Sequence, residues 1–397
     1  MIEWIECTIG DLCDTVSDTY RGNDENVILV NTSDVLEGKV LNHTQVPNKN
    51  LKGQFKKTFR KNDILFSEIR PANKRFAFID FEDTSNYIAS TKLMVLRHNE
   101  KVLPEYLFAI LKSNYILAEL QHLAETRSGT FPQITFSSEL APMKVNLPDK
   151  KTQKQIVSIL SSIEQKMDTN EIINNNLGQQ AQAIFKSWFV DFELTSGVIP
   201  SNWKVSQLGS ITKISTEVFS PVKNPNIEVE HYSIPAYDEK CYPIFETSND
   251  IKSNKYRLTS NSVMISKLNP NTKRIWRPYC ISKNPICSTE FIVYEAINPL
   301  NRDFVYSIID STGFSTFLCL HTTGSTNSRQ RVTPSITLTY DIVVPDEKTI
   351  QAFCSIVSPM YDTIENNIKE NQKLIKIRDK LLPKLMSGEL EVSNIGL

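Results

Sequence analysis

Several motifs that mark common enzyme and membrane-protein classes are missing from this sequence of 397 residues. It has only 12 glycines, and it contains neither a G-x-x-x-x-G-K-S/T phosphate loop nor a G-x-G-x-x-G dinucleotide motif. No stretch approaches the roughly 18 uninterrupted apolar residues of a membrane span. The opening Met1-Ile2-Glu3-Trp4 lacks the basic start and the apolar run of a signal peptide. We therefore expect a cytoplasmic chain that does not contact a membrane and carries no cofactor of its own.

Cysteine and histidine patterns give no sign of a disulfide framework or a metal site. The seven cysteines are odd in number and form no C-x-x-C pair, so reduced thiols are expected. The five histidines show no paired spacing. His98-x-Glu100 lacks the P-C-x-x-C partner of a deaminase, and Asn269-Pro270-Asn271 falls short of the N-P-P-aromatic motif of amino-methyltransferases. We expect no catalytic residue and no metal ligand in this chain.

Two long helices, one in the middle of the chain and one at its end, organise the sequence. The first is expected over 149–193, with Asp149 as its N-cap. Every seventh residue of this helix lies on one stripe, which has one Asn among apolar residues: Ile156, Ile163, Asn170, Leu177 and Ile184. A shift of 197 positions gives the matching stripe Phe353, Met360, Asn367, Leu374 and Leu381. Because such stripes need a partner helix, each helix is expected to dock on something like the other.

Details of these helices add further expectations. Ile159 and Ile173 occupy the fourth place of their heptads, and the stripe is widened by Leu160, Met167, Ala181 and Trp188 beside it. In an antiparallel pair, Asn170 and Asn367 could face each other and fix the register. Pro359 should break or kink the second helix near its start, and Pro383 with Ser387-Gly388 should end it. The residues expected at the spacer or at a partner interface are Ile163, Asn170, Leu177, Ile184, Trp188, Phe189, Met360, Asn367, Leu374 and Leu381.

The rest of the chain is an internal duplication. Trp4-x5-Gly10 recurs as Trp203-x5-Gly209, and the segment 62–71 recurs as 261–270. The order is therefore domain, helix, domain, helix, with boundaries at 1–147, 148–194, 195–344 and 345–397. In the first domain we expect strands over 27–30, 64–66, 76–81 and 92–96, and a helix over 104–123. Between the anchor motifs the halves differ, as expected if the two domains recognise different things.

Basic residues cluster at equivalent places in both halves, although the formal net charge of the chain is only −1. From Lys49 to Arg75 there are nine basic residues against two acidic ones, and from Lys252 to Lys283 there are eight against none. A single cluster of this kind is most often a solvated face. Its repetition within otherwise divergent sequence favours contact with a phosphate backbone.

Polar turns beside these clusters supply further candidate DNA contacts. Arginine can bond phosphate or a guanine edge, and Gln133 has the amide that reads adenine. An ordinary polar loop or a structural ion pair is about equally compatible with any one of these residues. The candidate DNA-binding residues are Arg70, Lys74, Arg75, Ser128, Gly129, Thr130, Gln133, Lys267, Lys273, Arg274, Arg277, Thr323, Gly324, Ser325, Arg329 and Arg331.

The sequence resembles the specificity subunits of type I restriction-modification systems over nearly its whole length. The resemblance rests on the two Trp-x5-Gly openings, on Leu147-Pro148 with Gln155-Ile156-Val157, on 174–193, which ends in Lys186-Ser187-Trp188-Phe189-Val190-Asp191-Phe192-Glu193, and on 378–390. It implies an α+β fold in which two similar mixed α/β target-recognition domains form a pseudo-twofold internal repeat. Two long helices forming an antiparallel coiled-coil spacer would separate these domains.

The same resemblance implies a function. Each domain would read one half of a bipartite, asymmetric site in double-stranded DNA, and the helices would set the distance between the half-sites. Two methyltransferase subunits would dock on the chain and supply S-adenosylmethionine, with 179–193 as the expected docking region. Restriction subunits would add ATP- and Mg-dependent translocation and cleavage. The chain itself would not be an enzyme.

Three other functions remain open from the residues alone. A stand-alone DNA-binding regulator would bind its site tightly without partners. A coiled-coil scaffold without nucleic-acid binding would not need the basic clusters. An enzyme would transfer a methyl group by itself.

Overall fold

The computed structural model describes residues 4–49, 51, 53–127, 132–324 and 330–390. The chain folds as two compact units, 1–167 with 372–397 and 168–371. Each unit thus holds one recognition domain together with one part of each long helix. Within the described residues, no helix is both long enough and apolar enough to cross a membrane.

The first unit has two four-stranded sheets, ordered β2-β11-β8-β9 and β6-β3-β10-β7, and a strand pair β1-β12. The first sheet is antiparallel throughout, whereas β10 is parallel to β3 in the second. The strands are β1 (Ile5–Thr8), β2 (Cys13–Val16), β3 (Asn26–Val30), β4 (Val35–Leu36), β5 (Lys39–Val40), β6 (Gln45–Pro47), β7 (Phe55–Lys57), β8 (Ile64–Ser67), β9 (Phe76–Phe78), β10 (Tyr87–Ser90), β11 (Leu93–His98) and β12 (Lys144–Leu147). The helices are α1 (Pro104–Leu111), α2 (Asn114–Arg127) and the first part of α3 (Lys150–Phe189).

The second unit repeats this plan. Its antiparallel sheet is ordered β14-β22-β19-β20, its mixed sheet is β15-β18-β21-β16-β17, and β13 pairs with β25. The strands are β13 (Lys204–Gln207), β14 (Thr212–Ser215), β15 (Val218–Phe219), β16 (Glu228–Tyr232), β17 (Ile244–Thr247), β18 (Lys255–Arg257), β19 (Ser262–Ser266), β20 (Ile275–Trp276), β21 (Pro285–Ser288), β22 (Phe291–Ala296), β23 (Thr322–Thr323), β24 (Arg331–Val332) and β25 (Asp341–Val344). The helices are α4 (Ile234–Lys240), α5 (Arg302–Ile309), α6 (Thr312–Leu320), α7 (Pro334–Thr337) and α8 (Glu347–Ser387).

The expected strands and the duplication are confirmed, with two differences. The expected strand over 76–81 is β9, which ends at Phe78. The helix expected over 104–123 is two helices, because the chain turns at Lys112-Ser113. The Ser113 side chain accepts a hydrogen bond from the Ile116 N–H (3.3 Å) and so caps α2.

Each long helix begins at an aspartate that caps it. The Asp149 carboxylate accepts from the backbone N–H of Thr152 (2.9 Å), and Asp346 accepts from that of Thr349 (3.1 Å). The bond from the Thr152 N–H lowers the pKa of Asp149, and the bonds from the Thr349 hydroxyl and N–H lower the pKa of Asp346. The cap at Asp149 confirms the expectation from the sequence.

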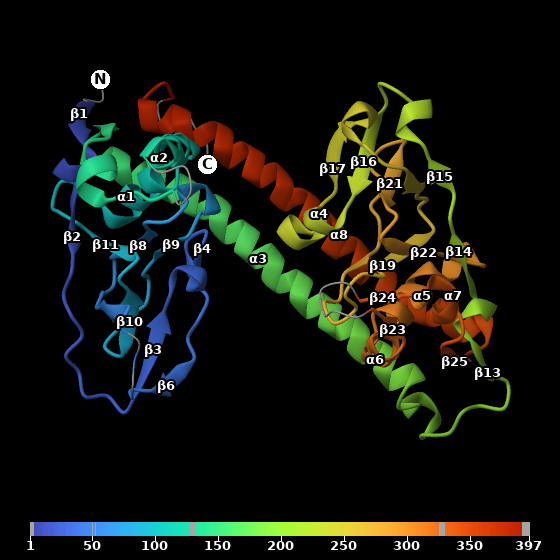
Figure 1. Ribbon diagram of the computed structural model, residues 1–397. Coiled ribbons are helices and arrows are strands. Elements are labelled where there is room, and N and C mark those ends of the chain that lie inside the picture. Colours follow the sequence, from blue (N-terminus) through green and yellow to red (C-terminus); the bar gives the residue numbers. More distant parts are fainter. Residues whose placement is uncertain (1–3, 50, 52, 128–131, 325–329, 391–397) are drawn as a thin grey trace. The chain divides into compact units, whose positions relative to one another are not determined.

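The ends of α3 and the course of α8 (green and red in Figure 1) differ from expectation. α3 ends at Phe189 rather than at 193, because Phe192 turns to φ 54° and the Ser187 hydroxyl bonds back to Glu193 (2.5 Å). α8 runs unbroken through Pro359 and Pro383 and ends at Ser387, before Gly388 with φ 76°. Both prolines are exposed, and buried Val357 and Tyr361 hold the helix on either side of Pro359.

In the second unit α3 and α8 run antiparallel. Asn170 donates to Asn371 Oδ1 (2.8 Å) and to Glu370 (2.7 Å), and Asn367 donates to Asn174 Oδ1 (2.9 Å). A later residue on α3 therefore pairs with an earlier residue on α8, as in an antiparallel pair. The expected Asn170–Asn367 contact is wrong, because each of these residues bonds instead to the Asn four positions further along the other helix, Asn371 and Asn174. Ile173 is also off the seam, with 38% of its surface exposed.

Apolar cores join each domain to its helices. In the first unit, Ile156 and Leu160 of α3 and Leu385 of α8 share a core with α1 and α2, and Ile163 and Leu381 pack on it. In the second unit, the core contains Phe185, Phe189 and Phe353, and Ile184, Trp188 and Met360 pack against it. Leu177 and Leu374 are half-buried. Phe185, which the heptad stripe omits, contacts Phe353 and Phe304 with ring centroids 6.1 and 6.2 Å apart.

Candidate nucleic-acid interface

The same tight turn follows the third strand of the antiparallel sheet in each unit. The Ser67 hydroxyl accepts from the Ile69 N–H (3.0 Å), as Ser266 accepts from the Leu268 N–H (3.2 Å). The next residue is left-handed in both halves, with φ 45° at Arg70 and φ 50° at Asn269. A proline follows in each case. The left-handed conformation is unfavourable for an L residue other than glycine. Its occurrence at both equivalent positions indicates that the two halves share one turn geometry.

A second segment, distant in sequence, lies along each turn. In the first unit the Arg70 N–H donates to Pro132 O (3.2 Å) and the Ile134 N–H donates to Glu68 O (2.9 Å). In the second unit the Asn269 N–H donates to Gln330 O (2.9 Å) and the Val332 N–H donates to Lys267 O (3.0 Å). We call 68–75 with 132–134 the first turn site, and 267–274 with 330–332 the second turn site. Each turn site unites two polar motifs that the sequence treats as separate.

The first turn site presents one exposed guanidinium. Within the residues that the structure describes, the Arg70 side chain has no hydrogen-bond or ion-pair partner. Lys74 pairs with Glu37 (3.1 Å) at the surface, and Arg75 donates to the carbonyl oxygens of Ser33 (3.0 Å) and Val35 (3.4 Å). Gln133 is half-buried beside the turn. The other candidates of this loop, Ser128, Gly129 and Thr130, lie outside the described residues.

A shallow hollow adjoins the first turn site. It has a volume of about 490 Å³ and is lined by Ala72 and Lys74 of the turn and by the α2 residues Asn114, Leu117, Ala118, Gln121, His122 and Glu125. The Gln121 side chain accepts from the Ala72 N–H (3.1 Å) and so fixes the turn on α2.

The second turn site presents amides, and most of its basic side chains are engaged. Lys273 pairs with Asp310, Arg274 forms a two-pronged bond to Asp238 (2.6 and 2.9 Å), and Arg331 pairs with Glu290 (3.0 Å). Burial raises the pKa of Asp310, and Lys273 offsets part of this effect. Asn271 instead lies near Gln330 (3.5 Å) and Cys319 (3.1 Å). Lys267 has a side chain without a partner in the described part of the chain.

The remaining candidates of the second site lie at its margin. Thr323 donates to Arg331 O (3.2 Å), and Gly324 adopts φ 138°. Ser325 and Arg329 lie outside the described residues. Surface ion pairs contribute little, typically about 0–1 kcal/mol, so a phosphate could replace Glu37 at Lys74 or Glu290 at Arg331. Whether these side chains contact DNA stays a prediction.

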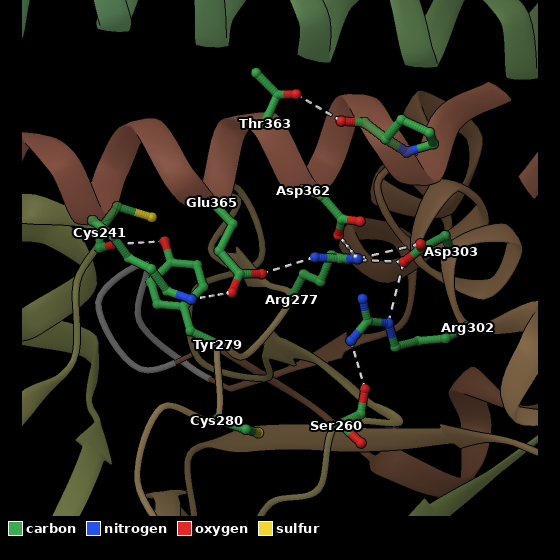
Figure 2. Close-up of polar contacts among 12 residues, drawn as sticks. Cys241, Ser260, Arg277, Tyr279, Cys280, Arg302, Asp303, Asp362, Thr363 and Glu365 are labelled. Atoms are coloured by element: carbon green, nitrogen blue, oxygen red, sulfur yellow. Dashed lines mark hydrogen bonds and ion pairs between the residues drawn. The ribbon is translucent and has the colours of Figure 1, made fainter. Parts of the chain in front are cut away.

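The expectation that Arg277 contacts DNA is wrong, because its side chain is largely buried and forms ion pairs within the protein. The side chain is 11% exposed, and its guanidinium pairs with Asp303 (2.9 Å), Asp362 (2.6 Å) and Glu365 (2.9 Å). Figure 2 shows it between Asp303 of α5 and the two carboxylates of α8. Burial alone would lower the pKa of Arg277, but the bonds to Asp303 and Asp362 raise it overall. Exposing this guanidinium to a phosphate would take it away from the buried Asp303 carboxylate, so Arg277 is removed from the expected DNA contacts.

One ion pair shows that the halves share a scaffold while their charges differ. In the first unit the Glu68 N–H donates to Lys92 O (3.0 Å), and their side chains lie 3.5 Å apart. At the equivalent place in the second unit, the Lys267 N–H donates to Glu290 O (2.9 Å). The acidic and basic residues have exchanged positions while the backbone bond is kept. The two turn sites therefore present different charge patterns on one backbone.

Sequence reasoning missed the acidic partners of the basic clusters. Glu37, Asp238 and Asp310 come from other elements and neutralise cluster residues that counting along the chain treated as free. Glu290 does the same for Arg331, outside the clusters. Within the described ranges, no three His, Cys, Asp or Glu side chains gather as a metal site would require.

Comparisons with known proteins agree over most of the chain. Residues 1–179 match the family model described as the type I restriction modification DNA specificity domain. The type I restriction enzyme HindI specificity subunit of Haemophilus influenzae is 31% identical over 465 aligned residues, which cover 98% of this chain and 100% of that protein. The type I restriction enzyme MjaIX specificity subunit of Methanocaldococcus jannaschii is 25% identical, over 74% of this chain and 71% of that protein.

A solved structure shows the same fold. The crystal structure of the type I restriction-modification system S subunit from M. genitalium has a TM-score of 0.55 and 15% identity, covering 97% of this chain and 96% of that one. The α+β fold, with its long helices and repeated domains, is thereby confirmed. By its full-length identity to the HindI subunit, the chain belongs to the family of type I restriction enzyme specificity subunits.

Proposed function

We propose that this chain is the non-catalytic DNA-recognition subunit of a type I restriction-modification complex. Each domain reads one half of a bipartite site in double-stranded DNA, and the α3–α8 pair sets the spacing between the halves. Two methyltransferase subunits dock on the chain, with 179–193 as the expected region, and bring S-adenosylmethionine. Restriction subunits bring the ATP- and Mg-dependent activity.

The observation that carries the proposal is the duplicated turn site with unlike side chains. The first site presents the guanidinium of Arg70, and the second presents the amides of Asn271 and Gln330. Guanidinium groups suit guanine edges and phosphates, whereas Asn and Gln suit adenine. One backbone geometry bearing two recognition chemistries supports an asymmetric target with two different halves.

Methylome sequencing tests this proposal. A host carrying the chain and its methyltransferase partner should acquire methylated sites that share two fixed half-sites separated by unspecified bases. Exchanging 195–344 for the same domain of a relative should change one half-site and leave the other unchanged. Loss of both half-sites in a correctly assembled exchange complex would contradict independent reading by the two domains.

A binding assay separates the proposed subunit from other kinds of protein. The complex with the methyltransferase should bind the mapped site tightly, and its affinity should fall steeply with salt concentration. Tight, specific binding by the isolated chain would support a stand-alone regulator. Methyl transfer by the isolated chain with added S-adenosylmethionine would overturn the non-catalytic role.

A further inference from the structure

A closed network of charges lies between the second domain and α8. It contains three cations, Arg277, Arg302 and Lys369, and three anions, Asp303, Asp362 and Glu365. Arg302 also donates to Ser260 O (2.5 Å), and Lys369 lies 5.7 Å from the centre of the Tyr279 ring. The charges balance within the network, and Figure 2 shows Glu365, Asp362 and Asp303 around the Arg277 guanidinium.

The network has an inner part and an outer part. Arg277, on the segment after β20, and Asp303, on α5, both belong to the domain, and the Asp303 side chain is only 7% exposed. Asp362 and Glu365 belong to α8, and their side chains are 60% and 17% exposed. Arg277 therefore joins an internal carboxylate of the domain to two carboxylates of the helix with bonds of fixed direction.

The ionic contacts lie at the far end of the apolar contacts between the domain and the helix. The apolar contacts come from the start of α8, from Ile350 to Tyr361, and Ile364 is partly buried against the same core. At about 1.5 Å per residue, Ile350 to Ile364 spans about 21 Å, and the domain reaches Asp362 and Glu365 at the end of this stretch. Apolar packing has no preferred direction, whereas a guanidinium held by three carboxylates resists rotation of the domain about the helix.

The first unit has no such network at the equivalent place within the described residues. The position of Arg277 is taken there by Phe78, which packs against Phe108 with ring centroids 5.5 Å apart. An ion pair between Lys112 and Glu164 joins that domain to α3. The two domains are thus attached to their helices by different chemistry, and a change to the network alters only the second attachment.

We propose that Arg277, Asp362 and Glu365 are positioning residues that fix the rotation of the second domain on α8 and so sharpen the choice of spacer length. The inference rests on the proposed function. One base pair of spacer moves a half-site by about 3.4 Å and rotates it by about 35°. A domain free to rotate about its helix accepts neighbouring spacers, and a domain locked by the network rejects them.

The test variant is Asp362→Asn with Glu365→Gln, in the chain assembled with its methyltransferase. This double change removes the outer ion pairs and leaves the internal Arg277–Asp303 pair, so the domain keeps its own core. The matched control is Glu217→Gln with Glu239→Gln, which removes the same charge from exposed positions in the domain. The control is needed because lost acidic charge strengthens nonspecific DNA binding.

The readout is the ratio of affinities for duplexes with the native spacer and with spacers one base pair shorter or longer. We expect this ratio to fall about tenfold in the test variant, which corresponds to about 1.4 kcal/mol, and to stay unchanged in the control. The conservative variant Asp362→Glu, with Glu365 kept, should retain the wild-type ratio. A general loss of stability would weaken binding to all three duplexes equally.

The outcomes distinguish the two proposals. If the wild-type complex shows a spacer preference and the test variant keeps it, the positioning role is overturned. If the wild-type complex shows no bipartite site at all, the proposed function fails before the network is tested. Equal weakening of all duplexes in the test variant assigns the network to stability alone and also overturns the positioning role.

Discussion

Lengthening both long helices by one heptad should lengthen the recognised spacer without changing either half-site. The Asn170–Asn371 and Asn174–Asn367 bonds set the register, so 171–177 of α3 faces 364–370 of α8. The variant duplicates both stretches in tandem. Seven residues return the helix to nearly the same face, with a drift of about 20°, so the apolar seam is kept.

The size of the effect follows from the helix rise. Seven residues add about 10 Å, and one base pair adds about 3.4 Å, so the spacer can grow by up to about three base pairs. Each added base pair also rotates one half-site relative to the other by about 35°. This rotation determines whether one, two or three added base pairs fit the lengthened protein. We therefore expect the commonest spacer to be one to three base pairs longer.

Methylome sequencing measures half-sites and spacer together. The control duplicates 171–177 alone, which puts the two helices out of register and should reduce assembly of the complex. An unchanged spacer in a well-assembled double-insertion complex would refute the view that the helix pair sets the distance.

Three further changes test the DNA contact, the ion network and the aromatic core. Arg70→Ala should weaken DNA binding and reduce the slope of log affinity against log salt by about 1, measured by fluorescence titration; an unchanged slope would remove Arg70 from the interface. The bonds to Arg277 outweigh burial and lower the pKa of Asp303 from its usual 3.8. Its stabilising contribution is therefore complete above about pH 4 and is lost as the pH falls through the folded pKa, so Asp303→Asn should flatten the acid limb of the denaturation curve; the same acid limb in both proteins would contradict this. Phe185→Ala should lower the free energy of unfolding by about 3–5 kcal/mol in a urea titration, and a loss under about 1 kcal/mol would show that its ring contacts contribute little.

The repeat and the long helices could be predicted from sequence because their signals are periodic or duplicated. The heptad stripe needs only spacing, and an offset near 198 aligns the two domains whatever their surfaces carry. The Asp149 cap was equally accessible, because capping depends on a few neighbouring residues.

Other features depend on distant parts of the chain. Pro359 reads locally as a helix breaker, yet the burial of Val357 and Tyr361 keeps α8 continuous. Phe185 lies off the heptad stripe because its partner is Phe304 of the domain as well as the other helix.

Charge was the least predictable property. Arg277 sits in the most basic segment of the second half, yet it is the most deeply engaged of the proposed contacts. Its partners lie 26 to 88 residues further along the chain, so no local count could find them. The turn sites, by contrast, were found by their repetition and not by their charge.

The division of the two units along the chain bears on how this protein is made. The second unit is one continuous stretch, 168–371, whereas the first needs Leu382 and Leu385 of α8 to complete a core begun at its N-terminal domain. On the ribosome, every residue of the second unit has been added before those two leucines are available. The first domain therefore waits with part of its apolar surface uncovered while the second can already close. The usual order, in which the N-terminal domain completes its folding first, is therefore reversed. Chaperone binding during synthesis should concentrate on the N-terminal half of the chain.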